Sequence, residues 1–485
     1  MIEGQKIIEN IFQLYKRHFG AEPQTATLLP LSGSDRKYYR LVRDGQSVIA
    51  AYNPNAAENI AFLEFTKHFF NCGLPVPEVL CEDNDNHIYI ISDLGDTTLF
   101  STLPHKLEQV DFSKDTIDIY KKVLEILPKF QVEAGKGINY DLCYPRHSFD
   151  RQSIMWDLNY FKYYFLKVGG ISFDEQKLEN CFNDFVKILA EADSDYFLYR
   201  DFQSRNIMLV EDKPYFIDYQ GGRKGALQYD VASLLYDAKA NIPFNLREEL
   251  LAHYIISLKN YISFDEAEFR ELYKAYVLVR VFQAMGAYGF RGFIEKKPVF
   301  LQSVPYAVNN IKYLLESGYI PEKLDYFKTI AERIIESPLQ EKYTPKILSE
   351  NKLTVRICSF SYKKGVPEDL SGNGGGFVFD CRALPNPGRE EKYKKLTGLQ
   401  NEVIDFLEDS PDVEMFFDNC SIIVSRAVEN YESRGFNNLM VSFGCTGGQH
   451  RSVYLAERLA KLLREKFNSL ISVEHLEKDN WPLKQ

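Results

Sequence analysis

The chain has 485 residues, more than one hydrophobic core usually supports, so two or more domains are expected. Hydrophobic residues at 45% and charged residues at 26% describe an ordinary globular protein. The formal net charge of −10 argues against a chain that coats nucleic acid through bulk electrostatics, although a local basic patch would still allow RNA binding.

The first twenty residues carry acidic and polar side chains throughout, which predicts an amphipathic helix and not a signal peptide with an apolar centre. No apolar run approaches the length of a membrane span. The eight cysteines are scattered without a Cys-x-x-Cys pair, so neither a zinc site nor a disulfide framework is indicated. The sequence therefore predicts a cytoplasmic protein without a membrane partner, and it leaves the oligomeric state open.

Alternating apolar segments and turns between Thr25 and Asp93 predict a small antiparallel sheet with one inserted helix. The helix is expected over Ala56 to Asn71, with Cys72-Gly73 at its C-terminal end. The strands are expected at Ala26 to Leu31, Lys37 to Val42, Ser47 to Tyr52, Val79 to Cys81 and His87 to Ser92.

The turn between the first two strands carries residues suited to phosphate. Ser32, Gly33 and Ser34 can present backbone N–H groups and hydroxyls to phosphate oxygens, and Arg36 and Lys37 supply positive charge. One glycine is a weak signal, and an ordinary hairpin turn explains the segment about as well without a downstream motif.

A downstream motif does follow, between two mostly helical blocks at Leu107 to Ala192 and Leu246 to Glu336. Asp201 and Asn206 have the spacing of an Asp-x-x-x-x-Asn catalytic loop, and Asp218 ends a short apolar run. In a kinase, one aspartate orients the attacking hydroxyl, while an asparagine and a second aspartate hold the metal ions that bridge the nucleotide phosphates.

Turn chemistry would explain any one of these three residues alone. Their joint spacing, with apolar runs on both sides of the loop, predicts the catalytic centre of a phosphotransferase. The small sheet followed by helices then corresponds to the N-lobe and the helical C-lobe of an α+β, protein-kinase-like bilobal domain.

A polar stretch with two prolines, Ser337 to Asn351, follows the second helical block and predicts a linker. We expect a kinase-like domain at 1–340, with its N-lobe at about 1–95 and its C-lobe at about 96–340. A linker at 341–351 then leads to a smaller α/β domain at 352–485. In that domain, strands and helices alternate: strands at Leu353 to Phe360, Gly376 to Asp380 and Asn438 to Phe443, and helices at Asn401 to Leu407, Val413 to Arg434 and Ser452 to Phe467.

A glycine-containing loop lies between the last predicted strand and the last predicted helix. Backbone N–H groups in such a loop point at an anion, the helix dipole adds to the attraction, and Arg451 can clamp two phosphate oxygens. The predicted anion site consists of Cys445, Thr446, Gly447, Gly448, Arg451 and Ser452.

The same loop satisfies the Cys-x5-Arg-Ser signature of phosphatases, in which a thiolate attacks phosphorus. Gly444 stands where a histidine ordinarily precedes the nucleophile, and no nearby aspartate is an obvious general acid. We therefore favour anion binding without turnover, with a phosphatase as the alternative.

Three segments of the first part resemble the aminoglycoside phosphotransferase superfamily, and most closely the anomeric kinases of N-acetylmuramate and N-acetylglucosamine. These segments are Leu31 to Arg40, Tyr199 to Asn206, and Ile217 to Gln220 together with Tyr229 to Leu235. The resemblance covers about the first 335 residues. It implies that the protein uses ATP and Mg²⁺ to phosphorylate a hydroxyl of an amino sugar.

By that resemblance, Asp201 is the catalytic base or positioning residue, Asn206 and Asp218 are the metal ligands, and Asp230 braces the loop from behind. Asp93 begins a turn that resembles the hinge whose backbone holds adenine, although a strand end followed by a turn is an equal alternative. The resemblance also implies that the acceptor is bound by Arg205, Arg151, Asp157 and Tyr160. A solvated helix face explains the charged pair, Arg151 and Asp157, as well.

Two residues depart from the family pattern. Gln203 stands where the related sugar kinases carry histidine, and the strand Ser47 to Tyr52 has no lysine for the α- and β-phosphates. We expect Arg36, Lys37 or Arg40 to supply that charge. Glu58 or Glu64, on the following helix, would then lack the lysine as its partner or serve another purpose.

The second part resembles the C-terminal domain of RapZ, the RNase adaptor protein, over Leu353 to Glu477. The matching motifs are Phe379 to Pro387, Leu396 to Leu399 and Gly444 to Ser452. In that family the domain senses glucosamine 6-phosphate and contacts a small RNA. This implies a phosphosugar or another anion at the loop and allows an RNA or protein partner. However, Gly388 replaces a ligand-contacting histidine of the family.

Both resemblances point to amino-sugar metabolism. We expect an ATP- and Mg²⁺-dependent kinase that forms a sugar 1-phosphate, joined to a phosphosugar-sensing domain. Two alternatives stay open: a kinase for a cationic acceptor such as an aminoglycoside or choline, and a nucleotide-binding regulatory protein whose C-terminal domain contacts RNA or a protein partner.

Overall fold

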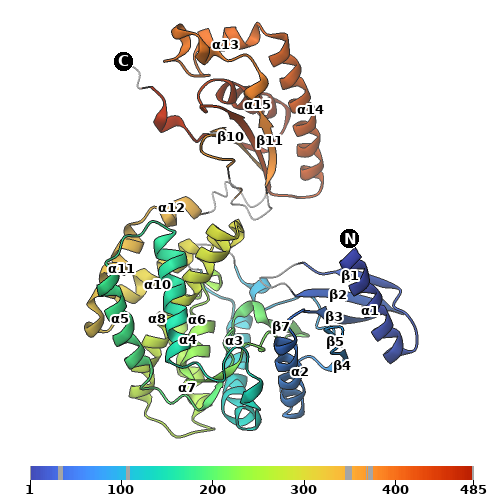
Figure 1. Cartoon of the computed structure of the whole chain (residues 1–485), viewed down its shortest axis with the longest axis vertical. Coiled ribbons are helices and arrows are strands. Elements are labelled where there is room, and N and C mark those ends of the chain that lie inside the picture. The colour runs from blue at the N-terminus through green and yellow to red at the C-terminus, as the bar shows by residue number, and fades with distance from the viewer. Residues whose placement is uncertain are drawn as a thin grey trace. The chain divides into compact units, whose positions relative to one another are not determined.

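The structure is a computed structural model that describes residues 2–30, 36–104, 110–344, 352–367, 369 and 375–482. The chain forms two compact units, whose elements are labelled in Figure 1. The first consists of Met1–Phe290 and Ser303–Lys342, and the second of Arg291–Gln302 and Tyr343–Gln485. The sequence did not predict that Arg291–Gln302 groups with the second unit.

The N-lobe of the first unit is a five-stranded antiparallel sheet in the order β1-β2-β3-β5-β4, close to the predicted set of strands. Strand β1 ends earlier than expected, and β4 extends further. The strands are β1 (Thr25–Leu28), β2 (Lys37–Arg43), β3 (Gln46–Tyr52), β4 (Val79–Asp83) and β5 (Ile88–Ser92).

One helix lies on each face of this sheet (Figure 1). The predicted amphipathic helix α1 (Ile2–Phe19) packs its apolar side against β2, β3 and residues Ile88 and Ile90 of β5. Tyr89, between these two, points to the opposite face, because side chains alternate along a strand. There it stacks on Phe62 of helix α2 (Ala56–Asn71) with ring centroids 5.0 Å apart.

The C-lobe is helical, as predicted, and its longest helix, α8, is buried along most of its length. A π-helical segment, η5 (Phe161–Lys167), continues α4 and packs against α8. The main helices are α3 (Lys114–Pro128), α4 (Arg151–Tyr160), α5 (Glu175–Leu189), α6 (Gln228–Leu235), α7 (Phe244–Leu258), α8 (Glu266–Gly289), α10 (Val304–Glu316) and α11 (Asp325–Glu336).

Two short antiparallel strand pairs carry the catalytic segment between these helices. Strand β6 (Tyr196–Leu198) pairs with β9 (Arg223–Gly225), and β7 (Ile207–Val210) pairs with β8 (Lys213–Phe216). This confirms that apolar strands enclose the predicted catalytic loop.

The predicted linker is partly helical. Helix α12 (Leu339–Tyr343) includes the first residues of the expected range 341–351. Leu339 and Tyr343 are buried, and these anchoring contacts depend on tertiary packing that composition alone does not reveal. The rest of the predicted linker, 345–351, lies outside the described residues.

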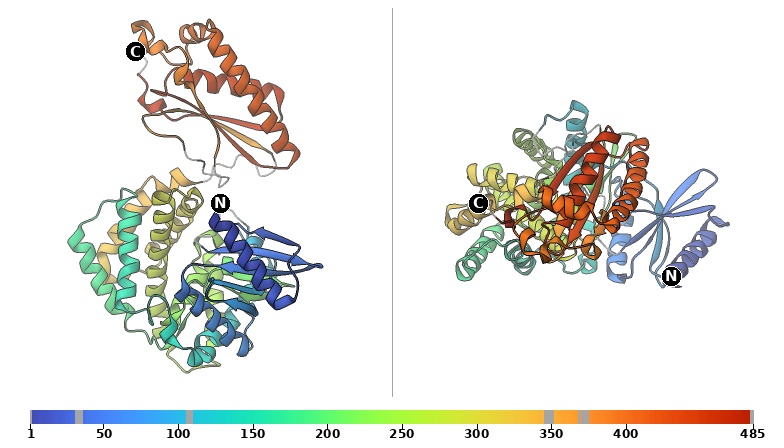
Figure 2. Two further views of the ribbon diagram at one scale, coloured as in Figure 1. Left: turned by 45° about the vertical axis from the view of Figure 1, so that its right-hand side comes forward. Right: turned by 90° about the horizontal axis from the view of Figure 1, so that it is seen from above.

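The second unit contains a four-stranded parallel sheet in the order β11-β12-β10-β13, with helices packed on it (Figure 2). Strand β13 was not predicted. The elements are β10 (Thr354–Ser361), β11 (Gly376–Asp380), α13 (Asn401–Glu408), α14 (Pro411–Ser433), β12 (Asn438–Cys445), α15 (Arg451–Lys466) and β13 (Leu470–His475), besides the short α9 (Pro298–Leu301).

The fold class is therefore confirmed: an antiparallel-sheet N-lobe and a helical C-lobe are followed by a smaller α/β unit. Within the described ranges, no helix is both long enough and apolar enough to span a membrane.

Candidate active site and anion-binding loop

The three residues predicted to form the catalytic centre lie together. Asn206, at the end of the 3-10 turn η6 (Ser204–Asn206), donates from its side-chain nitrogen to the backbone carbonyl of Asp201 at 2.8 Å. The same nitrogen donates to Oδ2 of Asp218 at 3.2 Å. Because the amide nitrogen makes both bonds, the amide oxygen of Asn206 is left for a cation.

Burial and the nearby carboxylate of Asp201 raise the pKa of Asp218. Two carboxylates held close together favour the binding of a divalent cation, which lowers the cost of keeping both ionised. Mg²⁺ commonly takes one or two protein carboxylates and completes its octahedron with phosphate oxygens and water. The described residues contain no group of three His, Cys, Asp or Glu suited to a metal. The carboxylate of Asp218 and the amide oxygen of Asn206, beside the carboxylate of Asp201, nevertheless fit Mg²⁺ bound together with a nucleotide.

The catalytic loop is fixed from behind by a buried carboxylate. Asp230 of α6 accepts hydrogen bonds from the backbone N–H groups of Tyr199 at 2.8 Å and Arg200 at 3.0 Å, and from the side chain of Gln131 at 3.0 Å. These contacts confirm the predicted bracing role. Burial raises the pKa of Asp230 to about 7, against the effect of the three donors.

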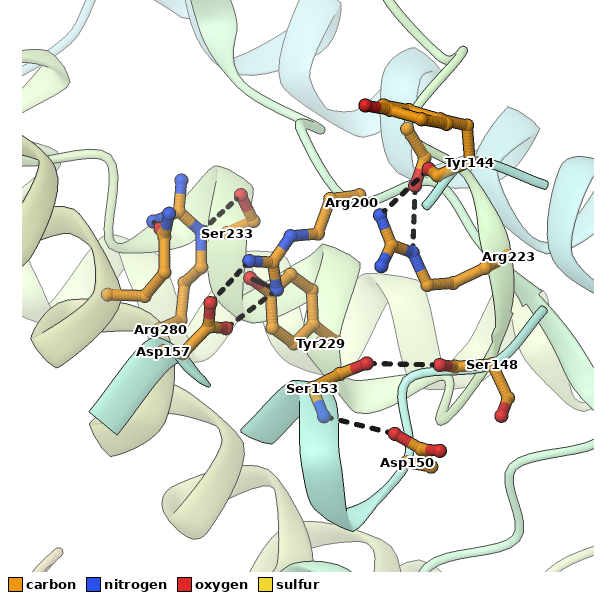
Figure 3. Close-up of polar contacts among 12 residues, drawn as sticks. Tyr144, Ser148, Asp150, Ser153, Asp157, Arg200, Arg223, Tyr229, Ser233 and Arg280 are labelled. Atoms are coloured by element: carbon orange, nitrogen blue, oxygen red, sulfur yellow. Dashed lines mark hydrogen bonds and ion pairs between the residues drawn. The ribbon is translucent and has the colours of Figure 1, made fainter. Parts of the chain in front are cut away.

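Arg200 adopts a φ of +80°, a conformation that is unusual for a residue with a side chain. Its guanidinium donates to both oxygens of Asp157 at 2.7 and 2.8 Å and to the hydroxyl of Tyr229 at 2.6 Å (Figure 3). Helix α4 thereby holds the catalytic loop through Asp157.

The residues predicted on the acceptor side do not converge through their side-chain contacts. The carboxylate of Asp157 is engaged by Arg200, whereas Arg151 donates to Asn183 of α5 at 2.5 Å. Tyr160 packs edge-on against Tyr164, and Arg205 is exposed. Their predicted contact with an acceptor stays a prediction.

On the nucleotide side, Ser32, Gly33 and Ser34 lie outside the described residues. Arg36 follows them and is 3% exposed. Its Nη2 lies 3.3 Å from Oε1 of Glu58, and its Nη1 donates to the hydroxyl of Tyr38 at 3.1 Å. Its Nε has no hydrogen-bond partner in the described part of the chain.

The other predicted nucleotide contacts differ in environment from Arg36. Lys37 is the half-buried first residue of β2. Asp93 accepts from Arg40 at 2.6 and 3.1 Å and from the backbone N–H of Gly95 at 2.9 Å. Although burial opposes ionisation, these bonds hold the pKa of Asp93 below its usual value. The carboxylate thus stabilises the turn, and any contact with adenine would involve the backbone.

In the second unit, the predicted anion loop connects β12 to the N-terminus of α15. The backbone N–H of Gly448, at φ +65°, donates to Sγ of Cys445 at 3.2 Å, and the hydroxyl of Ser452 lies 3.2 Å from the same sulfur. Burial of Cys445 opposes ionisation, but these bonds outweigh it and lower the pKa of the thiol. Thr446 and Gly447 are exposed.

Arg451 has a more structural environment than the sequence suggested. Its Nη1 donates to the backbone carbonyls of Arg382 and Leu384, both at 2.9 Å, which fixes the segment after β11. Its buried Nε has no partner among the described residues and is the donor still available to an anion. At Gly388, a Cβ would lie 3.3 Å from the ring of His450, so a larger side chain there would require a rearrangement.

Sequence reasoning missed two functional candidates, Arg200 as the partner of Asp157 and Arg223 after the Asp218 motif. The Gly221-Gly222-Arg223 run that follows Gln220 was the available signal, because two glycines allow a close approach of the backbone to the loop.

Comparisons with known proteins give a family for each of the two parts of the chain. The profile of the phosphotransferase enzyme family matches residues 25–272, and that of the RapZ C-terminal domain matches residues 353–479. Among solved structures, the chain is similar to an ADP-bound aminoglycoside phosphotransferase (TM-score 0.43, 12% identity, 69% of this chain and 98% of that one). It is also similar to the choline kinase LicA from Streptococcus pneumoniae (TM-score 0.41, 15% identity, 70% and 99%).

Curated relatives match the C-terminal part. A nucleotide-binding protein of Pseudothermotoga lettingae is 39% identical over 137 residues, which is 28% of this chain and 47% of that protein. One from Halorhodospira halophila is 42% identical over 125 residues, which is 26% and 42%. The chain thus spans about half the length of the curated relatives it matches. From the family matches, the chain belongs to the phosphotransferase enzyme family, as an enzyme that transfers a phosphoryl group to a hydroxyl acceptor, and it carries a RapZ C-terminal domain.

Proposed function

We propose that this small-molecule kinase uses ATP and Mg²⁺ to phosphorylate an amino sugar of the N-acetylmuramate or N-acetylglucosamine type at its anomeric hydroxyl. The observation that supports this most directly is the pair of hydrogen bonds from Asn206 to Asp201 and Asp218, which gathers the three groups that phosphoryl transfer requires.

In this proposal, Asp201 accepts a hydrogen bond from the acceptor hydroxyl and takes its proton as the oxygen attacks the γ-phosphorus. The bond from the γ-phosphorus to the β–γ bridging oxygen breaks, and ADP leaves. Asn206 and Asp218 hold Mg²⁺, which when bound neutralises charge on the β- and γ-phosphate oxygens. Arg200 and Asp230 keep the loop in the conformation that presents Asp201. Catalysis then comes from positioning and from fixed charge.

Arg36 and Glu58 together take the place of the strand lysine and helix glutamate of kinases. The pair joins the N-terminal end of β2 to α2, and the guanidinium has an unsatisfied Nε donor beside the predicted phosphate loop. An unsatisfied buried donor is costly, so a phosphate oxygen that accepts from it would stabilise the nucleotide-bound protein. Of the three cations considered from the sequence, Arg36 is the one with this geometry, because Arg40 is engaged by Asp93 and Asp96.

The RapZ C-terminal domain binds a phosphosugar, in our proposal, at the loop of Cys445, Thr446, Gly447, Gly448 and Ser452, with Nε of Arg451 as an additional donor. We favour binding over hydrolysis, because Nη1 of Arg451 is already bound to two carbonyls and Gly444 stands where a histidine would precede a phosphatase nucleophile.

A direct test is transfer of labelled phosphate from ATP to a panel of sugars, with kanamycin and choline as cationic acceptors. We expect label on an amino sugar in an acid-labile form, as a glycosyl phosphate should be. Transfer only to kanamycin or choline would show that the acceptor is cationic and would refute the amino-sugar proposal. Nucleotide binding without transfer to any acceptor would support the regulatory alternative.

A further inference from the structure

Three arginines from separate elements lie around the side of the catalytic loop shown in Figure 3. Arg200 belongs to the loop, Arg223 to β9 and Arg280 to α8; the last two are 7% and 4% exposed. In the described part of the chain, one carboxylate, Asp157, forms an ion pair with this group, and its partner is Arg200. The group therefore has more buried positive than negative charge.

Arg223 is the member whose guanidinium is least satisfied. Its Nε donates to the carbonyl of Gly221 at 3.0 Å, and its Nη2 makes a long contact of 3.4 Å with the carbonyl of Tyr144. In Figure 3 the remaining nitrogen carries no dashed line and is directed toward the side on which Arg200 and Tyr229 lie. Burial and repulsion by Arg200 lower the pKa of Arg223 to about 10.

A buried cation without a counterion is expensive for a folded protein. An anion that enters beside Arg223 would offset this cost and would form a charge-assisted hydrogen bond with the free nitrogen. Asp157 and Asp201 are the neighbouring carboxylates. Among the described residues, neither forms an ion pair with Arg223, and Asp157 is already shared between both terminal nitrogens of Arg200.

The position of Arg223 connects it to the reacting hydroxyl. A Cβ placed on Gly221, whose carbonyl Arg223 binds, would lie 3.7 Å from Oδ2 of Asp201. The guanidinium of Arg223 is therefore hydrogen-bonded to Gly221, which lies next to the proposed base Asp201. It belongs to the C-lobe, on the side of the loop next to Tyr144, whereas the proposed phosphate contact Arg36 belongs to the N-lobe.

We propose that Arg223 binds a carboxylate of the acceptor, so that the enzyme selects acidic sugars over their neutral counterparts. The inference rests on the proposed kinase activity, and it narrows the acceptor class within it. The same oxyanion chemistry could be supplied by the γ-phosphate of the nucleotide, and the experiment separates the two sources.

The experiment compares two matched acceptor pairs with the full chain: N-acetylmuramate against its methyl ester, and glucuronate against glucose. For the acidic member of at least one pair, we expect kcat/KM to be about 10- to 100-fold higher, the range that one charge-assisted hydrogen bond provides. Arg223→Gln should reduce that ratio to about 1 to 3, and Arg223→Lys should retain part of it.

The matched control is Lys224→Met, which removes one positive charge from the same strand. Lys224 forms an ion pair with the exposed Asp195 and does not touch the cluster, so the acid-to-neutral ratio should not change. Because Arg223 also supports the turn at Gly221, each variant is first compared with the wild type by thermal unfolding. If Arg223→Gln does not fold, the wild-type ratio and Arg223→Lys still decide the question.

A wild-type ratio near 1 in both pairs, or no transfer to either acid, would overturn the inference. It would also be overturned if Arg223→Gln raised KM for ATP and slowed both members of a pair equally, since the bound oxyanion would then belong to the nucleotide. A preference for glucuronate without transfer to any amino sugar would support the role of Arg223 and refute the amino-sugar proposal, so the two failures are distinguishable.

Discussion

At the scale of single residues, Asp201 is the group on which the proposed chemistry depends most directly. Asp201→Asn keeps the shape of the side chain and removes its ability to accept a proton. We expect kcat to fall about 10³-fold, the middle of the range for a general base, with KM for ATP little changed. Steady-state kinetics with the best acceptor would measure both constants.

The control for this change is Asp195→Asn, at a side chain that is 75% exposed and remote from the catalytic loop in its contacts. It should leave kcat within about two-fold of the wild type, as surface substitutions usually do. Retention of kcat within about ten-fold in Asp201→Asn would show that another group takes the proton.

The raised pKa of Asp230 has a consequence for the stability of the protein. This pKa is about 7 in the folded protein, raised by burial, against an ordinary value of 3.8. Between these two pH values the folded state binds one proton more than the unfolded state. The free energy of unfolding should therefore decrease as pH rises from about 4 to about 7, by up to about 4 kcal/mol from this group alone, and stay level above that.

Chemical denaturation of the wild type and of Asp230→Asn across this pH range would test the expectation. The variant should be less stable overall, because the N–H groups of Tyr199 and Arg200 donate to different oxygens of Asp230 and the new amide nitrogen would face one of them. Its slope with pH should nevertheless be shallower than that of the wild type. Equal slopes would mean that Asp230 is ionised throughout the range.

At the scale of elements, the pair of Arg36 and Glu58 connects β2 to α2 and should control nucleotide binding. Removal of Arg36 leaves Glu58 without a cation and deletes the donor next to the phosphate loop. We expect Arg36→Ala to raise KM for ATP about 10- to 100-fold, with a smaller effect from Glu58→Gln. Lys37→Ala is the comparison variant, because it removes the same charge from the next residue, the first of β2.

Isothermal titration with a non-hydrolysable ATP analogue would separate this effect from catalysis. An unchanged affinity in Arg36→Ala would exclude Arg36 from the phosphate site and would leave Lys37 as the candidate for the phosphate contact. A loss of affinity in Glu58→Gln as large as that in Arg36→Ala would show that Glu58 of α2 does more for nucleotide binding than orient Arg36.

The elements also show which parts of the site could be predicted from sequence. Asp201, Asn206 and Asp218 were found because their spacing is local and their flanking strands are apolar. The partners of Arg36 and Asp157 could not be found that way, because Glu58 is 22 residues after Arg36 and Arg200 is 43 residues after Asp157. Strand β13 was missed because its residues are only partly buried and its register is set by pairing with β10.

At the scale of the whole molecule, composition and periodicity predicted two folded parts of different architecture. They did not predict that Arg291–Gln302 would group with the second. Sequence patterns report which residues are apolar, whereas the assignment of a short segment to one of two cores depends on contacts across the chain. The same limitation explains why α12 was read as a linker.

Two separately folded units with two proposed ligands should respond to those ligands independently. In calorimetry of the full chain, ATP with Mg²⁺ should stabilise the first unit and glucosamine 6-phosphate the second. Each ligand should contribute about 2.7 kcal/mol at a concentration 100 times its dissociation constant. Chelation of Mg²⁺ with EDTA should abolish only the first effect.

Gly447→Val is the most direct test of the expected stabilisation of the second unit by glucosamine 6-phosphate. No atom lies within 4 Å of the position where a Cβ on Gly447 would stand, so the substitution should leave the thermal stability unchanged. The new side chain would nevertheless stand in the exposed loop, over the N–H groups proposed to bind the phosphate, and should remove stabilisation by glucosamine 6-phosphate. At Gly444, by contrast, a Cβ would lie 2.4 Å from the ring of Phe360, so Gly444→Ala should destabilise the unit itself. Full stabilisation of Gly447→Val by the phosphosugar would place its site elsewhere, because a β-branched side chain cannot share that space with a bound phosphate.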